Sequence, residues 1–141
     1  MNDTTYWPSP RMALDESLDV DSVKDQTGCT DEDYAELCRV FIDEGNNMMN
    51  RLQDAENAIS QANDAHQLSD ASNLLYTAAH ELSASFGIIG AHAAETYARE
   101  TQVQLRHRAG RGADATPPKP DLLKAAHVLL ASIKNCLALL R

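Results

Sequence analysis

The sequence predicts an all-α protein, built as an antiparallel four-helix bundle with a short leading helix. Its composition favours helices, because aromatic residues make up only 5% of the chain while Ala, Leu, Gln and Asn recur between acidic side chains. Apolar residues recur at steps of three and four along four long segments, which is the period of an amphipathic helix. Glycine, proline or capping residues separate these segments, so short connections and one longer loop are expected.

The chain is long enough for one domain with its own core. Its 141 residues are 43% hydrophobic, which can supply a core without disulfides or a metal. Residues 1–17 show no period and are expected to form a flexible leader, followed by a helical domain over residues 18–141. Residues 19–27 are predicted to form the leading helix, with their two valines facing inward and Gly28 just past its end.

The first long helix is predicted to start after Thr30 and to end at Asn63 and Asp64. Thr30 precedes three acidic residues, the arrangement of a capping box that suits the positive end of the helix dipole. Its apolar side consists of Tyr34, Leu37, Phe41, Gly45, Met48, Leu52, Ala55, Ile59 and Ala62. Gly45 is the weakest helix former in this stripe and is expected to mark a bend.

Three further helices follow the same pattern. The second long helix, capped by Asp64 and broken at Gly90, has the apolar stripe Leu68, Ala71, Leu75, Ala78, Leu82, Ser85, Phe86 and Ile89. The third has the thin stripe Ala91, Ala94, Ala98, Thr101 and Leu105, which predicts close packing through alanine. Residues 109–120 contain two glycines and three prolines and are predicted to form a loop. The last helix is predicted from Asp121, with Leu122, Ala126, Leu129, Ile133, Leu137 and Leu140 facing inward.

The distribution of charge argues against nucleic acid or a membrane as a partner. Residues 1–64 hold 15 acidic and 4 basic side chains, residues 65–141 hold 6 and 8, and the net charge is −9. Nucleic acid and anionic membranes require clustered Lys and Arg, so the expected partner is a protein. No signal peptide or membrane-spanning segment is expected, and the three cysteines lack a paired spacing. These features predict a cytoplasmic protein with reduced thiols.

His80 is predicted to lie on the solvent side of the second long helix. It is two residues from Ala78 and two from Leu82, which both belong to the apolar stripe, and two residues turn a helix by roughly 200°. The surface around it is predicted to consist of Tyr76, Thr77, Ser83, Ala84 and Gly87. Most of these side chains are small and would let a partner approach the imidazole, so the surface is interpreted as a docking site. A solvated imidazole, with a pKa of about 6.5, is largely neutral in the cytoplasm and can act as a nucleophile.

The residues around His80 resemble the signature of histidine phosphotransfer (Hpt) domains, which act in bacterial multistep phosphorelays. Residues 79–85 read AHELSAS, and Gly90 and Ala91 follow. The family pattern is AHxLKGS with a GA pair ten and eleven residues after the histidine. The resemblance covers roughly residues 19–141 and implies an Hpt-like bundle in which His80 is phosphorylated.

The resemblance also implies a function and a set of partners. His80 would accept a phosphoryl group from the aspartate of one response-regulator receiver domain and pass it to another, in a pathway that includes a hybrid sensor histidine kinase. The receiver would supply Mg²⁺ and most of the stabilising groups, so no cofactor is expected in this chain. It would have no kinase activity of its own, and the default state in this family is a monomer.

Two positions depart from the family pattern. Ser83 replaces the usual lysine, which removes a positive charge that would help to hold a phosphoryl group. Ala84 replaces the usual glycine, which adds a single methyl group. Ser83 therefore supports an alternative: a phosphate-independent helical adaptor with an Hpt fold that binds a receiver or kinase domain.

Other chemistries fit the sequence less well. A di-iron site in a helical bundle needs Glu-x-x-His pairs, and no glutamate here precedes a histidine by three residues. The other histidines, His66, His92, His107 and His127, lack a comparable small-residue setting and are interpreted as ordinary surface residues. Cys38 and Cys136 lie on or beside apolar stripes, which predicts structural rather than catalytic thiols.

Overall fold

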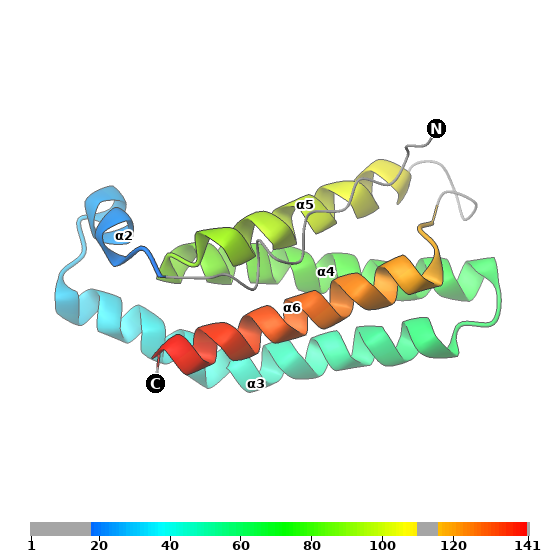
Figure 1. Cartoon of the computed structure of the whole chain (residues 1–141), viewed down its shortest axis with the longest axis horizontal. Coiled ribbons are helices and arrows are strands. Elements are labelled where there is room, and N and C mark those ends of the chain that lie inside the picture. The colour runs from blue at the N-terminus through cyan, green and yellow to red at the C-terminus, as the bar shows by residue number, and fades with distance from the viewer. Residues whose placement is uncertain (1–17, 110–115, 141) are drawn as a thin grey trace.

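The protein is all-α, as the sequence predicts. In the computed structural model, which describes residues 18–109 and 116–140, five helices follow one another and no strand occurs among those residues (Figure 1). The helices are α2 (Val20–Thr27), α3 (Asp31–Gln61), α4 (Ala65–Ile89), α5 (His92–Ala109) and α6 (Lys119–Leu140). The predicted leader, residues 1–17, and the centre of the predicted loop, residues 110–115, lie outside the described part of the chain.

Capping side chains fix the starts of α3 and α4. The predicted capping box is present at α3: the Asp33 amide donates to Thr30 Oγ1 (3.1 Å), and the Thr30 amide donates to the Asp33 carboxylate (3.2 Å). At α4, the Gln67 amide donates to the Asp64 carboxylate at 2.8 Å. These contacts satisfy amides that have no partner within the helix, so the local sequence determines where both helices begin.

Two glycines end helices at the predicted positions. Gly28 follows α2 with φ +71° and Gly90 follows α4 with φ +82°, a left-handed conformation that other residues rarely adopt. A Cβ atom on Gly90 would also lie 2.8 Å from the carbonyl oxygen of Asp19. The turn after α4 therefore depends on glycine both for its backbone conformation and for its contact with the segment before α2.

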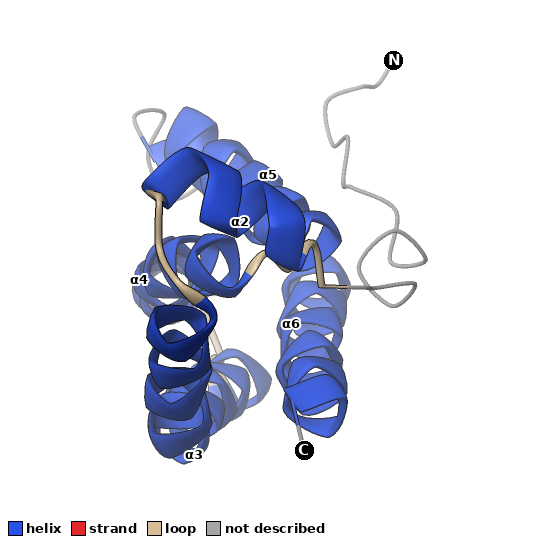
Figure 2. Ribbon diagram, turned by 90° about the vertical axis from the view of Figure 1, so that its left-hand side faces the viewer, coloured by secondary structure: helices blue, strands red, loops and turns tan. Residues whose placement is uncertain are grey.

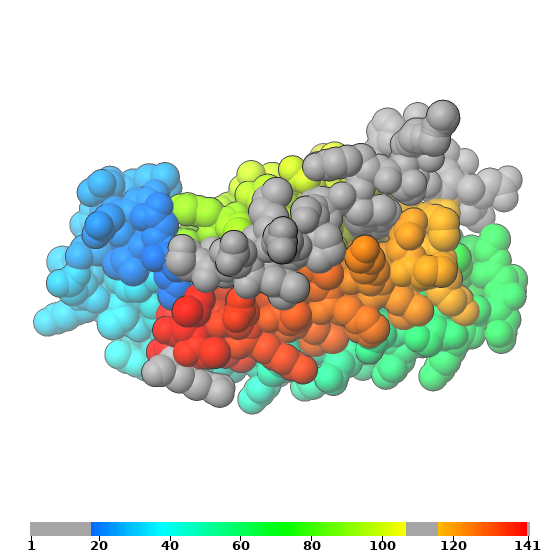
Figure 3. Space-filling view, in the orientation of Figure 1, coloured from blue at the N-terminus to red at the C-terminus, as the bar shows by residue number. Residues whose placement is uncertain are grey.

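The long helices lie along the long axis of the molecule (Figures 1 and 3). α4 packs against both α3 and α5, and α3 packs against α6 as well. α2 is short and lies across one end of the molecule, where it contacts α3 and α4 (Figure 2). α4 is thus covered on two sides by neighbouring helices and keeps a third side exposed between them.

Hydrogen bonds to helix ends fix how the elements meet. Tyr34 Oη, near the start of α3, donates to the carbonyl oxygen of Ile89 at the end of α4 (2.6 Å). At the other end of α3, Lys119 Nζ donates to the carbonyl oxygens of Ser60 (3.1 Å) and Ala62 (2.9 Å). The lysine at the start of α6 therefore satisfies carbonyls at the end of α3 and ties these two helices together.

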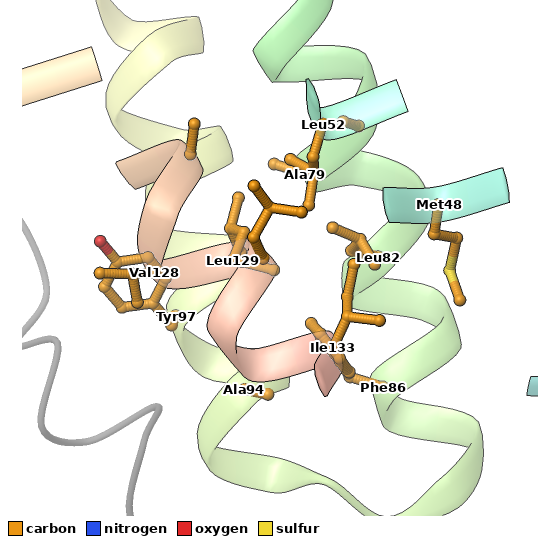
Figure 4. Packing of buried hydrophobic residues seen from close by; sticks show 14 of the residues in the cluster. Met48, Leu52, Ala79, Leu82, Phe86, Ala94, Tyr97, Val128, Leu129 and Ile133 are labelled. Atoms are coloured by element: carbon orange, nitrogen blue, oxygen red, sulfur yellow. The ribbon is translucent and has the colours of Figure 1, made fainter. Parts of the chain in front are cut away.

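The core is apolar and draws on every long helix. Figure 4 shows Leu82 and Phe86 of α4 beside Ile133 and Leu129 of α6. The Phe86 ring also packs against the ring of Phe41 of α3, with centroids 6.0 Å apart. Most residues of the predicted stripes are buried; the exceptions, which are only half-buried, are Val20, Tyr34, Leu37, Leu68, Ser85 and Leu140.

α3 is one unbroken helix through Gly45, the position where a bend is expected, and the missing side chain makes room for Leu137 of α6: a Cβ atom there would lie 3.1 Å from Leu137 Cδ1. Two details differ from the prediction. α6 begins at Lys119, two residues earlier than predicted, because Pro120 falls in its first turn, where proline is tolerated. α6 is also buried on more sides than the single predicted stripe, so it is a core helix.

The apolar character of α6 has a second consequence. By length and composition alone this helix could cross a membrane, and half of its most apolar window, 50%, is buried inside the molecule. A core helix of a folded domain passes the same test, and its buried residues pack into the core described above. Cys38 and Cys136 are buried in this core as predicted, and burial raises the pKa of the Cys38 thiol.

Candidate functional site

His80 lies on the exposed side of α4, as its spacing predicts. The neighbouring stripe residues Ala78 and Leu82 are buried, with 4% and 1% of their surface exposed, whereas His80 is exposed. The helix continues without interruption for more than two turns on either side of the histidine. The imidazole is therefore carried on a rigid backbone and points away from the core.

One nitrogen of the imidazole is held by α5. Gln102 Nε2 lies 2.9 Å from His80 Nδ1, and this amide nitrogen can only donate, so in this orientation the hydrogen bond requires an unprotonated Nδ1. Among the described residues, no hydrogen-bond partner is found for His80 Nε2. The contact with Gln102 thus fixes the ring through Nδ1 and leaves Nε2 open to a partner.

The hydrogen-bond chain continues beyond Gln102. Gln102 Nε2 lies 3.4 Å from Tyr76 Oη, and Arg106 Nε donates to the same hydroxyl at 3.3 Å. Tyr76 is one helical turn before His80 on α4, and Gln102 and Arg106 are one turn apart on α5. The hydrogen bonds run in the order Arg106, Tyr76, Gln102, His80. Each of them joins a residue of α5 to a residue of α4.

The hydrogen bonds change the acidity of the tyrosine. Hydrogen bonds from Gln102 and then from Arg106, together with the charge of the guanidinium, hold the pKa of Tyr76 below its ordinary value of 10.0. Tyr76 is half-buried between α4 and α5, so its ring packs against the helices while its hydroxyl reaches the surface. A residue predicted only to contact a partner is therefore part of the local polar structure around His80.

The other predicted docking residues share the same helix but have different surroundings. Thr77 and Ala84 are exposed, whereas Ser83 and Gly87 are half-buried. Ser83 Oγ donates to the backbone carbonyl of His80 (2.9 Å), so its hydroxyl hydrogen is directed to the helix. Thr77 Oγ1 donates to the backbone of α4 in the same way, at 3.1 Å. Both hydroxyls therefore donate to the helix backbone and present only acceptor oxygen to a partner.

Gly87 is small for a structural reason that the sequence did not indicate. A Cβ atom at this position would lie 2.7 Å from Oε2 of Glu95, whose side chain crosses from α5. The same carboxylate oxygen accepts from Arg99 at 2.7 Å. The space beside Gly87 is thus occupied by an ion pair of the protein itself. Ala84, one turn closer to His80, remains open.

Charged side chains surround the histidine on both flanks. On the α3 side, Arg51 pairs with Glu81 at 2.6 Å, next to His80 in sequence. On the α5 side, Arg99 and Arg106 lie one turn before and one turn after Gln102. Arg106 donates to a neutral hydroxyl rather than to a carboxylate, so its positive charge is not neutralised by that contact. The guanidinium of Arg106 is therefore the cation linked to His80 through hydrogen bonds.

Gln102, Arg106 and Arg99 of α5 are not among the residues that the sequence predicts around His80. A signal existed, because Glu95, Arg99, Gln102 and Arg106 recur at steps of four, three and four and so share one side of α5. That polar stripe borders the apolar one at Thr101 and Leu105. The sequence alone does not show which helix such a stripe faces, so its role became visible only with the packing of α4 on α5.

The remaining candidate groups do not form a competing site. Within residues 18–109 and 116–140, no cluster of three His, Cys, Asp or Glu side chains could hold a metal ion. His66 pairs with Asp70 at 3.6 Å along α4, and His127 of α6 pairs with Glu56 of α3. His92 lies 3.6 Å from both Asp19 and Glu95. Each of these histidines faces carboxylates, whereas His80 faces an amide and keeps one nitrogen open.

Comparison of the chain with protein-family models, curated proteins and solved structures finds no significant match. The features that bear on function are therefore the geometry of His80, Gln102, Tyr76 and Arg106 and the spacing of the residues around the histidine.

Proposed function

We propose that this chain is a histidine-containing phosphotransfer protein that relays a phosphoryl group between receiver-domain aspartates through His80. The proposal includes an antiparallel four-helix bundle of the Hpt type, a cytoplasmic location and a monomeric state. Its partners are response-regulator receiver domains and a hybrid sensor histidine kinase. The single observation that carries it is an exposed imidazole held at Nδ1 by Gln102, with Nε2 open to an incoming partner.

The chemistry requires little from the chain besides a positioned nucleophile. The lone pair of His80 Nε2 attacks the phosphorus of an aspartyl phosphate, an N–P bond forms, and the P–O bond breaks to return its electron pair to the aspartate carboxylate. In the second half-reaction, Nδ1 takes up a proton from solvent, an aspartate oxygen of another receiver attacks phosphorus, and the N–P pair returns to Nε2 of a neutral imidazole. Such transfer depends mainly on in-line positioning and on neutralising the equatorial oxygens, which the receiver and its Mg²⁺ would provide.

The local charge supports the proposal despite the missing lysine. Ser83 cannot supply a positive charge, and its hydroxyl donates to the His80 carbonyl. Arg106, however, stays linked to the histidine through Tyr76 and Gln102, and no carboxylate neutralises it at that contact. Positive charge near a transferring phosphoryl group stabilises the negative charge on its oxygens in the transition state, so α5 can supply what the departure at position 83 removes.

The decisive experiment is phosphoryl transfer from labelled receivers. A panel of receiver domains carrying ³²P on aspartate is mixed with the wild-type chain, with His80→Gln and with His66→Gln, and label is followed on gels. Acid-labile, base-stable label is expected on the wild type and on His66→Gln but not on His80→Gln. His66 is also an exposed histidine of α4, so it controls for a general effect of losing an imidazole. Equal label on His80→Gln would refute the proposal.

The second candidate function is a phosphate-independent adaptor that binds a receiver or kinase domain through the same surface. Ser83 in place of lysine is the observation that favours it. The adaptor would bind a receiver without taking label, and its affinity would not depend on His80. Measuring receiver affinity for the wild type and for His80→Gln alongside label transfer therefore separates the two functions.

A further inference from the structure

The hydrogen bond between Gln102 and His80 must change direction during the relay described above. A neutral imidazole carries one proton, and attack by Nε2 requires that proton to be on Nδ1. Nδ1 is then a donor and needs an acceptor at the position that Gln102 occupies. Once the N–P bond has formed and Nδ1 has released its proton to solvent, Nδ1 is an acceptor and needs a donor at the same position.

A glutamine can satisfy both states because its side chain carries a carbonyl oxygen and an NH₂ group of nearly equal size. In the structure the NH₂ group faces Nδ1 at 2.9 Å, and a half-turn about the last side-chain bond of Gln102 replaces it there by the carbonyl oxygen. The other group in contact with that same amide atom must tolerate the exchange as well. That group is the hydroxyl of Tyr76, 3.4 Å away.

We infer that Tyr76 is a positioning residue that lets the Gln102 amide serve as acceptor for unphosphorylated His80 and as donor for phosphorylated His80. The inference rests on the proposed function. When the Gln102 oxygen faces Nδ1, the Tyr76 hydroxyl donates its proton to that oxygen. When the Gln102 NH₂ group faces Nδ1, the hydroxyl accepts from it instead. A hydroxyl has one proton and two acceptor lone pairs, so both arrangements are available to it.

Arg106 occupies one lone pair of the Tyr76 hydroxyl. The guanidinium has only donors, and its Nε donates to Tyr76 Oη at 3.3 Å in either arrangement. One lone pair of the hydroxyl is thus always occupied, which leaves its proton and its second lone pair for Gln102. The hydrogen bond from Gln102 and then that from Arg106 lower the pKa of Tyr76. A hydroxyl that accepts from a cation is also a stronger donor.

The test reads the position of the proton directly. With ¹⁵N-labelled histidine at about pH 8, where an imidazole is neutral, NMR distinguishes Nδ1–H from Nε2–H in the unphosphorylated protein. The wild type is expected to hold mainly Nδ1–H. Tyr76→Phe is expected to shift the ring towards Nε2–H and to slow phosphoryl acceptance from phosphoramidate about three- to tenfold, the effect of losing one neutral hydrogen bond.

Two further variants make the test specific. Tyr97→Phe removes a tyrosine hydroxyl from the buried side of α5, where it takes no part in these hydrogen bonds, and is expected to leave the proton position and the acceptance rate unchanged. Adding Gln102→Glu to Tyr76→Phe provides a carboxylate that can only accept, so it is expected to restore Nδ1–H. A merely structural role for Tyr76 would not be rescued in this way.

The outcomes separate this inference from the function on which it rests. If Tyr76→Phe changes neither the proton position nor the acceptance rate, the inference is overturned, whatever His80 does with receivers. If the wild type takes no label from phosphoramidate or from receivers, the proposed function fails. A shift of the ring proton in Tyr76→Phe would then still support the role of Tyr76 in setting the Nδ1 hydrogen bond.

Discussion

The inner and outer sides of the α4–α5 helix pair each contain a tyrosine, and the two tyrosines behave in opposite ways. Tyr97 of α5 lies on the inner side with 2% of its surface exposed, and burial raises its pKa to about 12. Tyr76 of α4 lies on the outer side, where hydrogen bonds from Gln102 and Arg106 lower its pKa. The same side chain is thus a core residue in one place and a polar element of the candidate site in the other.

The difference shows how a single pair of helices can separate stability from chemistry. On the inner side, the contacts are apolar and tightly packed, so losing atoms there should reduce the free energy of unfolding. On the outer side, the contacts are hydrogen bonds at the surface, where solvent can replace a lost partner. Substitutions on the outer side should therefore change the hydrogen bonding of His80 and its interaction with partners, while the fold remains intact.

The largest expected effect compares two neighbouring residues of α4. Leu82→Ala, on the inner side, should lower the free energy of unfolding by roughly 2 to 5 kcal/mol, because it leaves a cavity against α6 (Figure 4). His80→Ala, on the outer side, should change it by less than about 0.5 kcal/mol. Urea unfolding followed by circular dichroism measures both. A loss of more than about 2 kcal/mol of unfolding free energy in the His80 variant would contradict this separation of stability from chemistry.

A second substitution tests whether the outer side docks a partner. Ala84 is exposed one turn after His80, and Trp at this position would cover the approach to the imidazole. Ala84→Trp should weaken receiver binding at least 100-fold, about 3 kcal/mol, while leaving the unfolding midpoint unchanged. Calorimetric titration with a receiver measures the affinity. Asn73→Trp, two turns before His80 on the same exposed side of α4, is the matched control for adding an indole. Unchanged affinity in Ala84→Trp would exclude docking over this surface.

The inner side was largely predictable from the sequence. Periodicity placed Leu75, Leu82 and Leu129 in the core, and capping residues and Gly90 gave the ends of the helices, because these features depend on local sequence. Exposure of His80 followed from the same periodicity. Burial at Ala79 and Tyr97 was missed, because both lie beside the predicted stripes and are covered only when a second helix packs alongside.

The outer side was predictable only in part. His80 and its neighbours on α4 could be grouped, since residues three and four apart share a side of one helix. Gln102, Arg106 and the Glu95 carboxylate above Gly87 come from α5, and their contacts depend on the rotation of one helix against the other. That rotation is a property of the helix pair, and periodicity within one helix does not specify it. The contact of Gly45 with Leu137 was not predictable for the same reason, since it arises between helices.

The two tyrosines themselves provide a test by pH. The folded state holds the Tyr97 proton more tightly than the unfolded chain, whose tyrosine pKa is about 10. Stability due to this proton is therefore complete below pH 10 and is lost as the pH rises towards 12, by about 2 kcal/mol. Tyr97→Phe should reduce this alkaline loss, measured as the change in unfolding free energy between pH 9 and pH 12. Tyr76→Phe should not reduce the alkaline loss, because the pKa of Tyr76 is shifted the other way. An equal effect of the two variants would refute the proposed difference between the two tyrosines.

The smallest expected effect concerns Gly87, where the outer side of α4 is in tight contact with α5. An added methyl group would lie 2.7 Å from Glu95 Oε2, but that oxygen is at the end of a flexible side chain and can move. Weakening the exposed Glu95–Arg99 pair costs at most about 1 kcal/mol, and replacing glycine by alanine inside a helix gains about the same. Gly87→Ala should thus change the free energy of unfolding by less than about 1 kcal/mol in either direction. Adding Glu95→Ala removes the clash, so the double variant should be more stable than Glu95→Ala alone by the helix-propensity gain of alanine over glycine. If the double variant were no more stable, the backbone of α4, rather than the carboxylate, would limit the space at Gly87.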